Sequence, residues 1–183
     1  LSVVTERENA FLKGSFEQDP DLILRKVMEM LEEAEENGFG PGEIRAVGIS
    51  GQMHGILYVD AAGRAVSPLY TWKDGKGKEL RTEDLSYEAY LRRETGLPLF
   101  SGYGTVTHFF LGEKGIIPGE AVKFAGIGDY LAMCLTGRQS PLVEDSMAAG
   151  FGGFDIRSGS FAWDLLKRAG VNTKFYPELC RSG

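Results

Sequence analysis

The sequence predicts an α/β domain built in layers. Segments with a strand pattern alternate with segments with a helix pattern along the whole chain, which favours this class over a β-sandwich or a helical bundle. The 183 residues are enough for a single domain. Glycine is abundant, at 25 residues against 7 prolines, which indicates many tight turns and close backbone approaches.

The first half of the chain predicts one helix and several short strands. Residues 1–7 have a strand pattern that begins partway, so we expect a missing segment upstream. A helix is expected from Asp19, because Asp19-Pro20-Asp21 supplies a cap, a first-turn proline and an acidic group, and Asn37-Gly38 ends it. A buried strand is expected over residues 44–50, after Gly40-Pro41-Gly42. A hairpin over residues 56–60 and 64–66 follows.

The second half continues the alternation. Glycines at the expected helix ends and apolar residues at helical spacing mark four helices, and short apolar runs mark two strands. We expect the helices over residues 86–94, 105–111, 128–135 and 163–169, and the strands over residues 121–125 and 140–143.

Composition excludes several classes of function. The net charge of −6 argues against electrostatic binding of nucleic acid or of an anionic membrane surface. With two cysteines a disulfide scaffold is excluded, and no run of apolar residues is long enough to span a membrane. The sequence contains neither a phosphate-binding Gly-x-x-x-x-Gly-Lys-Ser/Thr loop, nor cysteine and histidine spacings for zinc, nor a Gly-x-Ser-x-Gly elbow.

Polar residues follow predicted strands at three places, where open α/β sheets bind ligands. The first is Gln52-Met53-His54, between Gly51 and Gly55. The glycines allow the backbone to approach a ligand, and the polar side chains offer donors and acceptors to hydroxyl groups. The alternative is that His54 only caps a turn.

The second place is Trp72-Lys73-Asp74-Gly75-Lys76. A carboxylate accepts hydrogen bonds from sugar hydroxyls, and an indole ring covers the apolar face of a sugar. The alternative is an ordinary Asp-Gly turn beside a half-buried tryptophan. Nearby Lys76, Lys78 and Arg81 could meet a phosphate, or form a solvated helix face.

The third place is Glu144-Asp145, followed by the small residues of Ser146-Met-Ala-Ala-Gly150. A carboxylate fixed at the end of a strand suits a general base that acts on a substrate hydroxyl. The alternative is the acidic N-terminus of a short helix.

In this order the three places resemble the N-terminal domain of the FGGY family of carbohydrate kinases. Gly48-Ile-Ser-Gly-Gln-Met-His-Gly55 is similar to the sugar-site segment of xylulokinases and sedoheptulokinases, and Trp72-Lys-Asp-Gly-Lys76 to the family's Trp-x-Asp-Gly-Arg. Thr95-Gly-Leu-Pro98, Ser101-Gly-Tyr-Gly104, Gly126-Ile-Gly-Asp-Tyr-Leu131 and Asp145-x-x-Ala-Ala149 fit the same pattern. The resemblance covers essentially the entire chain.

The resemblance implies a ribonuclease-H-like, actin-like ATPase fold, with a mixed sheet flanked by helices and truncated at its N-terminal strands. It implies that Asp145 is the general base, with Glu144 as the alternative register. Residues implied in sugar binding are Gln52, Met53, His54, Gly55, Trp72, Asp74, Tyr103 and Glu144. We expect these side chains to surround one hollow the size of a polyol.

The family pattern also includes parts that this sequence lacks. An Asp-x-Gly-Thr strand would precede residue 1, and the domain that holds the nucleotide would follow residue 183. The resemblance therefore implies that residues 1–183 are the sugar-binding domain of a two-domain, cytoplasmic kinase that uses ATP and Mg²⁺ and can form a homodimer. Without the missing parts, this chain should bind no cofactor and should be inactive.

Two other readings remain. The chain could be a non-catalytic sugar-binding or interaction domain that has kept the pocket. It could also be a metal-dependent nuclease that uses Asp74, Glu144 and Asp145 as ligands, which the acidic composition argues against. The sequence does not identify the sugar, because the size of the pocket depends on the placement of loops.

Overall fold

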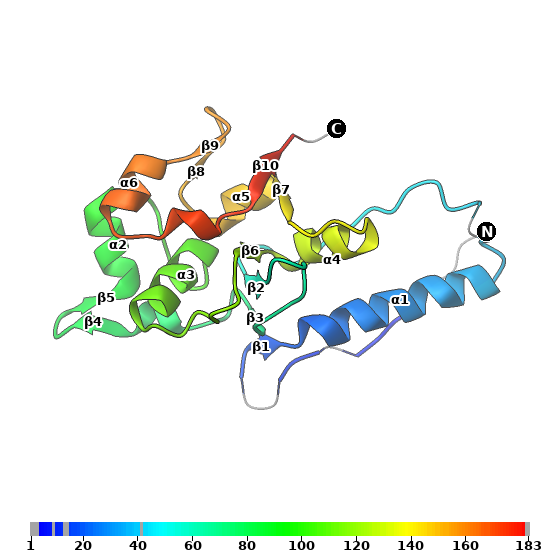
Figure 1. Cartoon of the computed structure of the whole chain (residues 1–183). Coiled ribbons are helices and arrows are strands. Elements are labelled where there is room, and N and C mark those ends of the chain that lie inside the picture. Colours follow the sequence, from blue (N-terminus) through cyan, green and yellow to red (C-terminus); the bar gives the residue numbers. More distant parts are fainter. Residues whose placement is uncertain (1–3, 9, 13–14, 41, 182–183) are drawn as a thin grey trace.

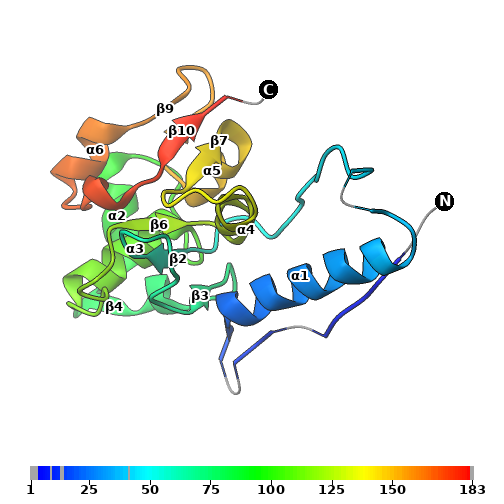
Figure 2. The same cartoon turned by 45° about the vertical axis from the view of Figure 1, so that its right-hand side comes forward.

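The molecule consists of a main body and a projecting arm that contains the long helix α1 (Figures 1 and 2). The computed structural model describes residues 4–8, 10–12, 15–40 and 42–181. In both views helix α1 (Pro20–Glu36) meets the main body at its N-terminal end and extends away from it. The segment that follows α1 returns to the main body.

The strands are short and pair in twos. Antiparallel pairs join β1 (Glu17–Gln18) to β3 (Leu69–Tyr70), β2 (Leu57–Val59) to β6 (Lys123–Ala125), β4 (Leu80–Thr82) to β5 (Leu85–Ser86), and β8 (Phe154–Asp155) to β9 (Ser160–Phe161). A parallel pair joins β7 (Leu142–Glu144) to β10 (Glu178–Cys180). A bridge between Ile56 and Tyr70 places β3 next to β2. The strand pairing is therefore mixed.

Five helices surround these strands in the main body. They are α2 (Tyr87–Thr95), α3 (Gly104–Glu113), α4 (Ile127–Leu135), α5 (Asp145–Phe151) and α6 (Trp163–Arg168), together with the 3-10 turns η1 (Lys76–Lys78) and η2 (Thr173–Phe175). None of the helices in the described ranges is long and apolar enough to cross a membrane.

The β2–β6 pair is the centre of the layers, because both of its faces are buried. Tyr58 and Phe124 point into an aromatic cluster that also contains α3 and α5 residues, while Leu57 and Ala125 pack on the opposite side against α4 and α1. Every residue of α3 from Gly104 to Leu111 is buried. The sequence prediction of a layered α/β domain is confirmed.

Capping residues define the helix ends where the sequence predicts them. The Asp19 carboxylate accepts from the backbone N–H groups of Asp21 and Leu22, and the Ser86 hydroxyl accepts from that of Ala89. Gly96 ends α2 in the left-handed conformation, with φ of 71°. All the helices predicted from the sequence are present, with bounds shifted by one or two residues.

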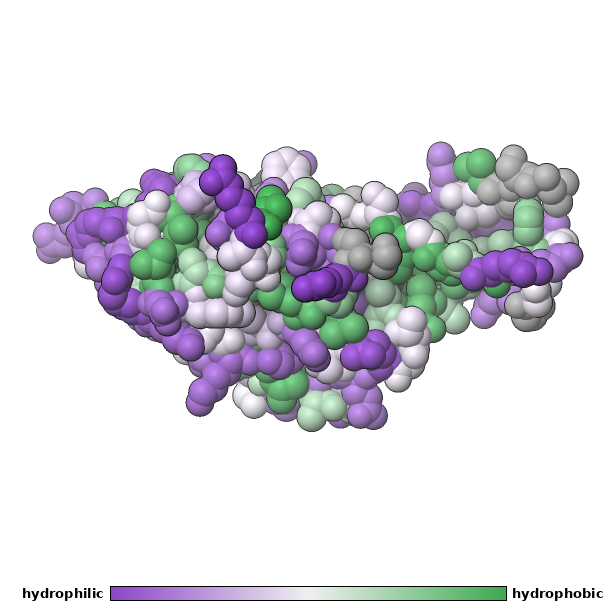
Figure 3. Space-filling model, turned by 90° about the horizontal axis from the view of Figure 1, so that it is seen from above, coloured by the Kyte–Doolittle hydropathy of each residue, from purple (hydrophilic) through white to green (hydrophobic). Residues whose placement is uncertain are grey.

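The strand predicted over residues 44–50 is wrong. This segment is extended, makes no backbone hydrogen bond with a described residue, and exposes Val47 and Ile49, which are 55% and 40% accessible. Figure 3 shows apolar residues gathered where the main body meets the arm. A strand needs a partner for its backbone groups, and apolar patterning alone does not supply one.

The predicted N-terminal strand is also absent where it can be tested. Val4 to Arg7 form no strand, and the rest of that prediction, residues 1–3, lies outside the described residues, as does Pro41. The predicted hairpin is present in a narrow form. It is closed by Asp60 N–H donating to the Arg64 carbonyl and Val66 N–H donating to the Tyr58 carbonyl, with one bridge between Val59 and Ala65.

Candidate functional site

The loop of residues 52–55 enters the main body at a strained turn. His54 has φ of 73°, the only positive φ of a non-glycine residue among the described residues. The Gly55 N–H donates to the Met53 carbonyl at 2.9 Å. A Cβ atom on Gly55 would lie 2.7 Å from the Tyr70 carbonyl oxygen, so only glycine fits there. The loop is therefore held against β3 at its C-terminal end.

Two neighbours hold the His54 ring. Tyr103, the N-cap residue of α3, stacks on it with ring centroids 4.5 Å apart and an angle of 3° between the planes. The His54 Nδ1 atom lies 2.5 Å from the Gly150 carbonyl oxygen in α5. Residues from three distant parts of the sequence thus meet at one imidazole.

Glycines bring the surrounding backbones into direct contact. A Cβ atom on Gly104 would lie 3.1 Å from the His54 carbonyl oxygen, and one on Gly102 would lie 2.0 Å from the carbonyl oxygen of Trp72. The Ser101 hydroxyl donates to the Asp74 carbonyl at 3.0 Å. The loop that precedes α3 therefore contacts both the 52–55 loop and the segment that contains Trp72 and Asp74. The 52–55 loop in turn contacts α5, which begins at Asp145.

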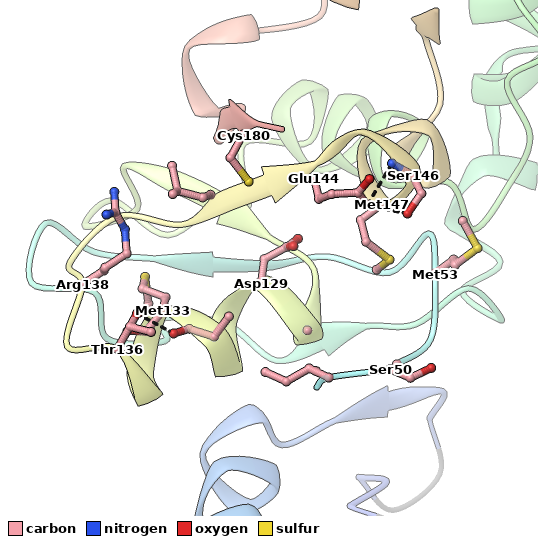
Figure 4. A pocket seen from close by; sticks show the side chains of 15 residues that line it. Ser50, Met53, Asp129, Met133, Thr136, Arg138, Glu144, Ser146, Met147 and Cys180 are labelled. Carbon is pink, nitrogen blue, oxygen red and sulfur yellow. Dashed lines mark hydrogen bonds between the residues drawn. The ribbon is translucent and has the colours of Figure 1, made fainter. Parts of the chain in front are cut away.

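A cavity of about 750 Å³ lies beside this junction, between the 49–53 segment, α4 and β7 (Figure 4). Met53 and Glu144 line the same side of it, together with Ser146 and Met147. Asp129, from the first turn of α4, projects into the middle of the cavity wall.

The Asp129 carboxyl group has an unusual environment. Burial raises its pKa to about 7, and the negative charge of Glu144 adds to the rise, although a hydrogen bond from the Gly126 N–H opposes it. That hydrogen bond, 3.0 Å long, fixes the carboxyl group at the start of α4. Asp129 is therefore a proton-binding group near neutral pH inside the cavity.

Glu144 and Asp145 have different surroundings although they are adjacent. Glu144 is the N-cap residue of α5, and its carboxylate accepts from both the N–H and the hydroxyl of Ser146. Asp145, the first residue of α5, lines a separate cavity of about 420 Å³ that also contains Arg157. The Asp145 carboxylate makes no hydrogen bond or ion pair with any described residue.

The Asp74 carboxylate is engaged in a buried ion pair. It lies 2.7 Å from the Lys76 ammonium, which is also 3.0 Å from Glu17. The cavity that Asp74 lines is a third one, of about 300 Å³. The Trp72 side chain is 52% exposed. Packing thus brings the predicted segments together, but Asp74, Glu144 and Asp145 line three different cavities.

Gln52 reaches away from the other predicted residues. Its amide nitrogen donates to the side-chain oxygen of Gln18 in β1, at 2.5 Å. This bond ties the loop to the β1–β3 pair and so supports the position of His54. In this structure Gln52 therefore connects the 52–55 loop to β1.

Two residues of the site were not singled out from the sequence. Asp129 lies within Gly126-Ile-Gly-Asp-Tyr-Leu131, and its position three residues after a helix cap was the available signal. Gly150 contributes a carbonyl group, which no side-chain pattern reveals. In the part of the chain that the structure describes, no three His, Cys, Asp or Glu side chains are grouped to hold a metal ion.

Comparison with known proteins gives a consistent result. The profile of the FGGY family of carbohydrate kinases, N-terminal domain, matches residues 4–183. The chain is 31% identical to a mouse (Mus musculus) sedoheptulokinase over 184 residues, and 25% identical to a xylulose kinase of Staphylococcus xylosus over 173. These alignments cover 91% and 92% of this chain, but only 37% and 35% of the two relatives.

A solved structure shares the fold. The ligand-bound xylulose kinase of Lactobacillus acidophilus superposes with a TM-score of 0.76 at 22% identity, over 95% of this chain and 36% of that protein. The fold is thus that of the N-terminal part of an actin-like sugar kinase. Because the family profile spans almost the entire sequence, the chain belongs to the FGGY family of carbohydrate kinases.

Proposed function

We propose that this chain is the sugar-binding, N-terminal part of a two-domain kinase that transfers the γ-phosphoryl group of ATP to a hydroxyl of a ketose or related polyol. The family match over residues 4–183 carries the proposal. The meeting of His54, Tyr103 and α5 at one point supports it, because polar groups fixed next to a cavity can orient hydroxyl groups.

Asp145 is the proposed general base. It would take the proton from the attacking sugar hydroxyl while that oxygen forms a bond to the γ-phosphorus and the bond to the leaving ADP breaks. A base needs a free lone pair, and the Asp145 carboxylate has no hydrogen-bond or ion-pair partner among the described residues. Glu144, the alternative, already accepts two hydrogen bonds from Ser146 as the cap of α5.

The residues proposed to orient the sugar lie where the 52–55 loop meets the start of α3. Met53 and His54, with Gly55 allowing close approach, would face the substrate, and Tyr103 would hold the imidazole. Trp72 presents an exposed ring that can cover an apolar sugar face. Gln52, Asp74 and Glu144 complete the proposed set of sugar-binding residues. In this structure their side chains contact Gln18, Lys76 and Ser146 respectively.

ATP and Mg²⁺ belong to the intact enzyme in this proposal. ATP would supply the phosphoryl group and Mg²⁺ would neutralise the phosphate charge. In the family pattern that the sequence resembles, an Asp-x-Gly-Thr strand and a separate nucleotide domain would hold both. This chain alone is therefore proposed to be inactive. A cytoplasmic location is part of the proposal, as the family resemblance implies.

Substitution of the two adjacent carboxylates in the full-length kinase tests the assignment. We expect Asp145→Asn to lower kcat by about 10²–10⁴-fold, the contribution of a positioned base, with sugar binding retained. The matched control is Glu144→Gln, which keeps a capping oxygen and should lower kcat far less. Unchanged turnover in Asp145→Asn would show that Asp145 is not the base.

A second candidate function is a sugar-binding domain without catalysis. The polar groups fixed around His54 beside the cavity favour considering it, because they could bind a sugar without any phosphoryl transfer. Calorimetric titration of the 183-residue chain with xylulose, ribulose, sedoheptulose and glycerol measures binding directly. Phosphorylation by the full-length protein, together with binding by this chain, would support the kinase, whereas binding without any phosphorylation would support the second candidate.

A further inference from the structure

The two histidines of the chain have opposite hydrogen-bonding patterns. In His108 the Nε2 atom lies 2.9 Å from the Asn172 carbonyl oxygen, and Nδ1 lies 2.7 Å from the Tyr58 hydroxyl. In His54 it is Nδ1 that faces a carbonyl oxygen, that of Gly150. A carbonyl oxygen only accepts hydrogen bonds, so the ring nitrogen that faces it must donate.

This rule assigns a different neutral tautomer to each ring. His108 carries its proton on Nε2, and its Nδ1 accepts from Tyr58. In the neutral form of His54 the proton is on Nδ1, which leaves Nε2 with a lone pair. The Nε2 atom of His54 has no hydrogen-bond partner among the residues that the structure describes, and the side chain is half-buried rather than enclosed.

We propose that the Gly150 carbonyl and the Tyr103 ring are positioning groups that hold His54 as the Nδ1–H tautomer, so that Nε2 accepts a hydrogen bond from a hydroxyl of the sugar. This inference rests on the proposed function. The inference adds the direction of the hydrogen bond at His54, because the substrate must be the donor there.

The geometry of the ring supports a fixed orientation. The Tyr103 ring stacks parallel to the imidazole, with 3° between the two planes, which restricts rotation about the Cβ–Cγ bond of His54. The backbone of His54 is in the left-handed region, which is unfavourable for a residue with a side chain and persists only where neighbours enforce it. The ring and the backbone are therefore both constrained.

The enforcing neighbours are the facing ends of α3 and α5. A Cβ atom on Gly150 would lie 3.4 Å from the backbone nitrogen of His54 and 3.2 Å from the Cε atom of Met53, so α5 already touches the loop. The Thr105 hydroxyl donates to the Gly152 carbonyl at 2.9 Å and ties the two helices together. Since α5 begins at Asp145, the proposed base and the positioning carbonyl are on one short helix.

The tautomers are measurable without any sugar. Long-range proton–nitrogen correlation spectra of the ¹⁵N-labelled 183-residue chain at pH 7.5 distinguish protonated from unprotonated ring nitrogens. We expect a protonated Nδ1 in His54 and a protonated Nε2 in His108. Spectra of His54→Gln and His108→Gln assign the two sets of signals. A protonated Nε2 in His54, or an equal mixture of its tautomers, would overturn the inference.

Tyr103 variants test the positioning role. We expect Tyr103→Leu, which removes the stacked ring, to give a mixture of His54 tautomers, while the matched Tyr103→Phe keeps the wild-type pattern. Dispersed amide signals, and an unchanged His108 pattern, report that each variant is folded. If Tyr103→Leu leaves the His54 tautomer pure, Tyr103 is not a positioning group.

Sugar binding by the full-length kinase tests the acceptor role. We expect Tyr103→Leu to weaken binding of its preferred ketose about tenfold relative to Tyr103→Phe, the scale of one lost hydrogen bond. Equal binding by the two variants would overturn the acceptor role. Wild-type enzyme that binds none of xylulose, ribulose, sedoheptulose or glycerol contradicts the proposed function, whereas the wrong tautomer contradicts only this inference.

Discussion

Two buried groups, His108 and Asp129, should give the stability of this domain opposite pH dependences. Burial lowers the pKa of His108 to about 4, although the carbonyl of Asn172 opposes the shift. The unfolded chain therefore binds a proton on this residue near pH 6.5, well before the folded chain does. The stability that neutral His108 provides is present above pH 6.5 and is lost as the pH falls from 6.5 to about 4.

Asp129 responds in the other direction. Its pKa is about 7 in the folded domain and near 3.8 in the unfolded chain, so the folded state binds the proton more tightly. Its contribution to stability is greatest below the unfolded pKa, and it is lost as the pH rises through the folded pKa of about 7. Asp129 thus favours the folded state in acid, where His108 opposes it.

The two contributions are similar in size between pH 8 and pH 5. With a factor of about 1.4 kcal/mol for each pH unit between the two pKa values, His108 loses about 2 kcal/mol over this interval. Asp129 gains about 3 kcal/mol over the same interval. The net effect of the pair on the wild-type free energy of unfolding is therefore small, and only single variants reveal either part.

Urea unfolding at pH 8 and pH 5 measures these contributions. Relative to wild type, Asp129→Asn should lose about 3 kcal/mol more stability on acidification, and His108→Gln about 2 kcal/mol less. Carboxylates that do not interact with either residue affect all variants alike, and the double variant Asp129→Asn/Glu144→Gln against Glu144→Gln tests for the contribution of Glu144, whose charge acts on Asp129. Direct NMR titration of His108 in the wild type provides a check that needs no substitution. A His108 imidazole that titrates near pH 6.5 would refute the reasoning.

Two further predictions concern close packing and buried charge. Gly102→Ala should destabilise the domain by at least about 3 kcal/mol, because a left-handed φ of 86° combines with a Cβ position 2.0 Å from the Trp72 carbonyl oxygen. The control Gly159→Ala, with φ of 62° and nothing within 4 Å, should lose only about 1–2 kcal/mol in the same urea experiment. Lys76→Met should lose about 3 kcal/mol at pH 7, because it leaves the buried Asp74 carboxylate without its ion-pair partner. An equal loss for the two glycine variants, or an unchanged free energy of unfolding for Lys76→Met, would contradict these explanations.

Local signals in the sequence predict the helices well, because they act between residues that are close along the chain. Asp19 caps α1 through hydrogen bonds to residues two and three positions later, and Gly96 ends α2 through its own backbone conformation. Neither interaction depends on the rest of the fold. The sequence therefore contains all the information that these boundaries require.

Contacts across the fold are the part that sequence patterns could not supply. The 44–50 segment has the composition of a buried strand, yet no described residue pairs with it. Asp74 has a carboxylate of the kind that binds sugar hydroxyls, yet in this structure that carboxylate forms an ion pair with Lys76. In each case the outcome depends on which groups meet in space, and a single sequence does not record that.

The His54 site shows which information a resemblance to a family supplies and which it leaves out. Motifs identify His54 and Tyr103 as residues of interest, but the partner of the imidazole is the carbonyl group of Gly150, which every residue type possesses. What the sequence does specify at Gly150 and Gly104 is the absence of a side chain, and this absence lets two helix ends reach one loop. The chemistry of this site therefore depends as much on where the chain leaves room for backbone contact as on which polar side chains it contains.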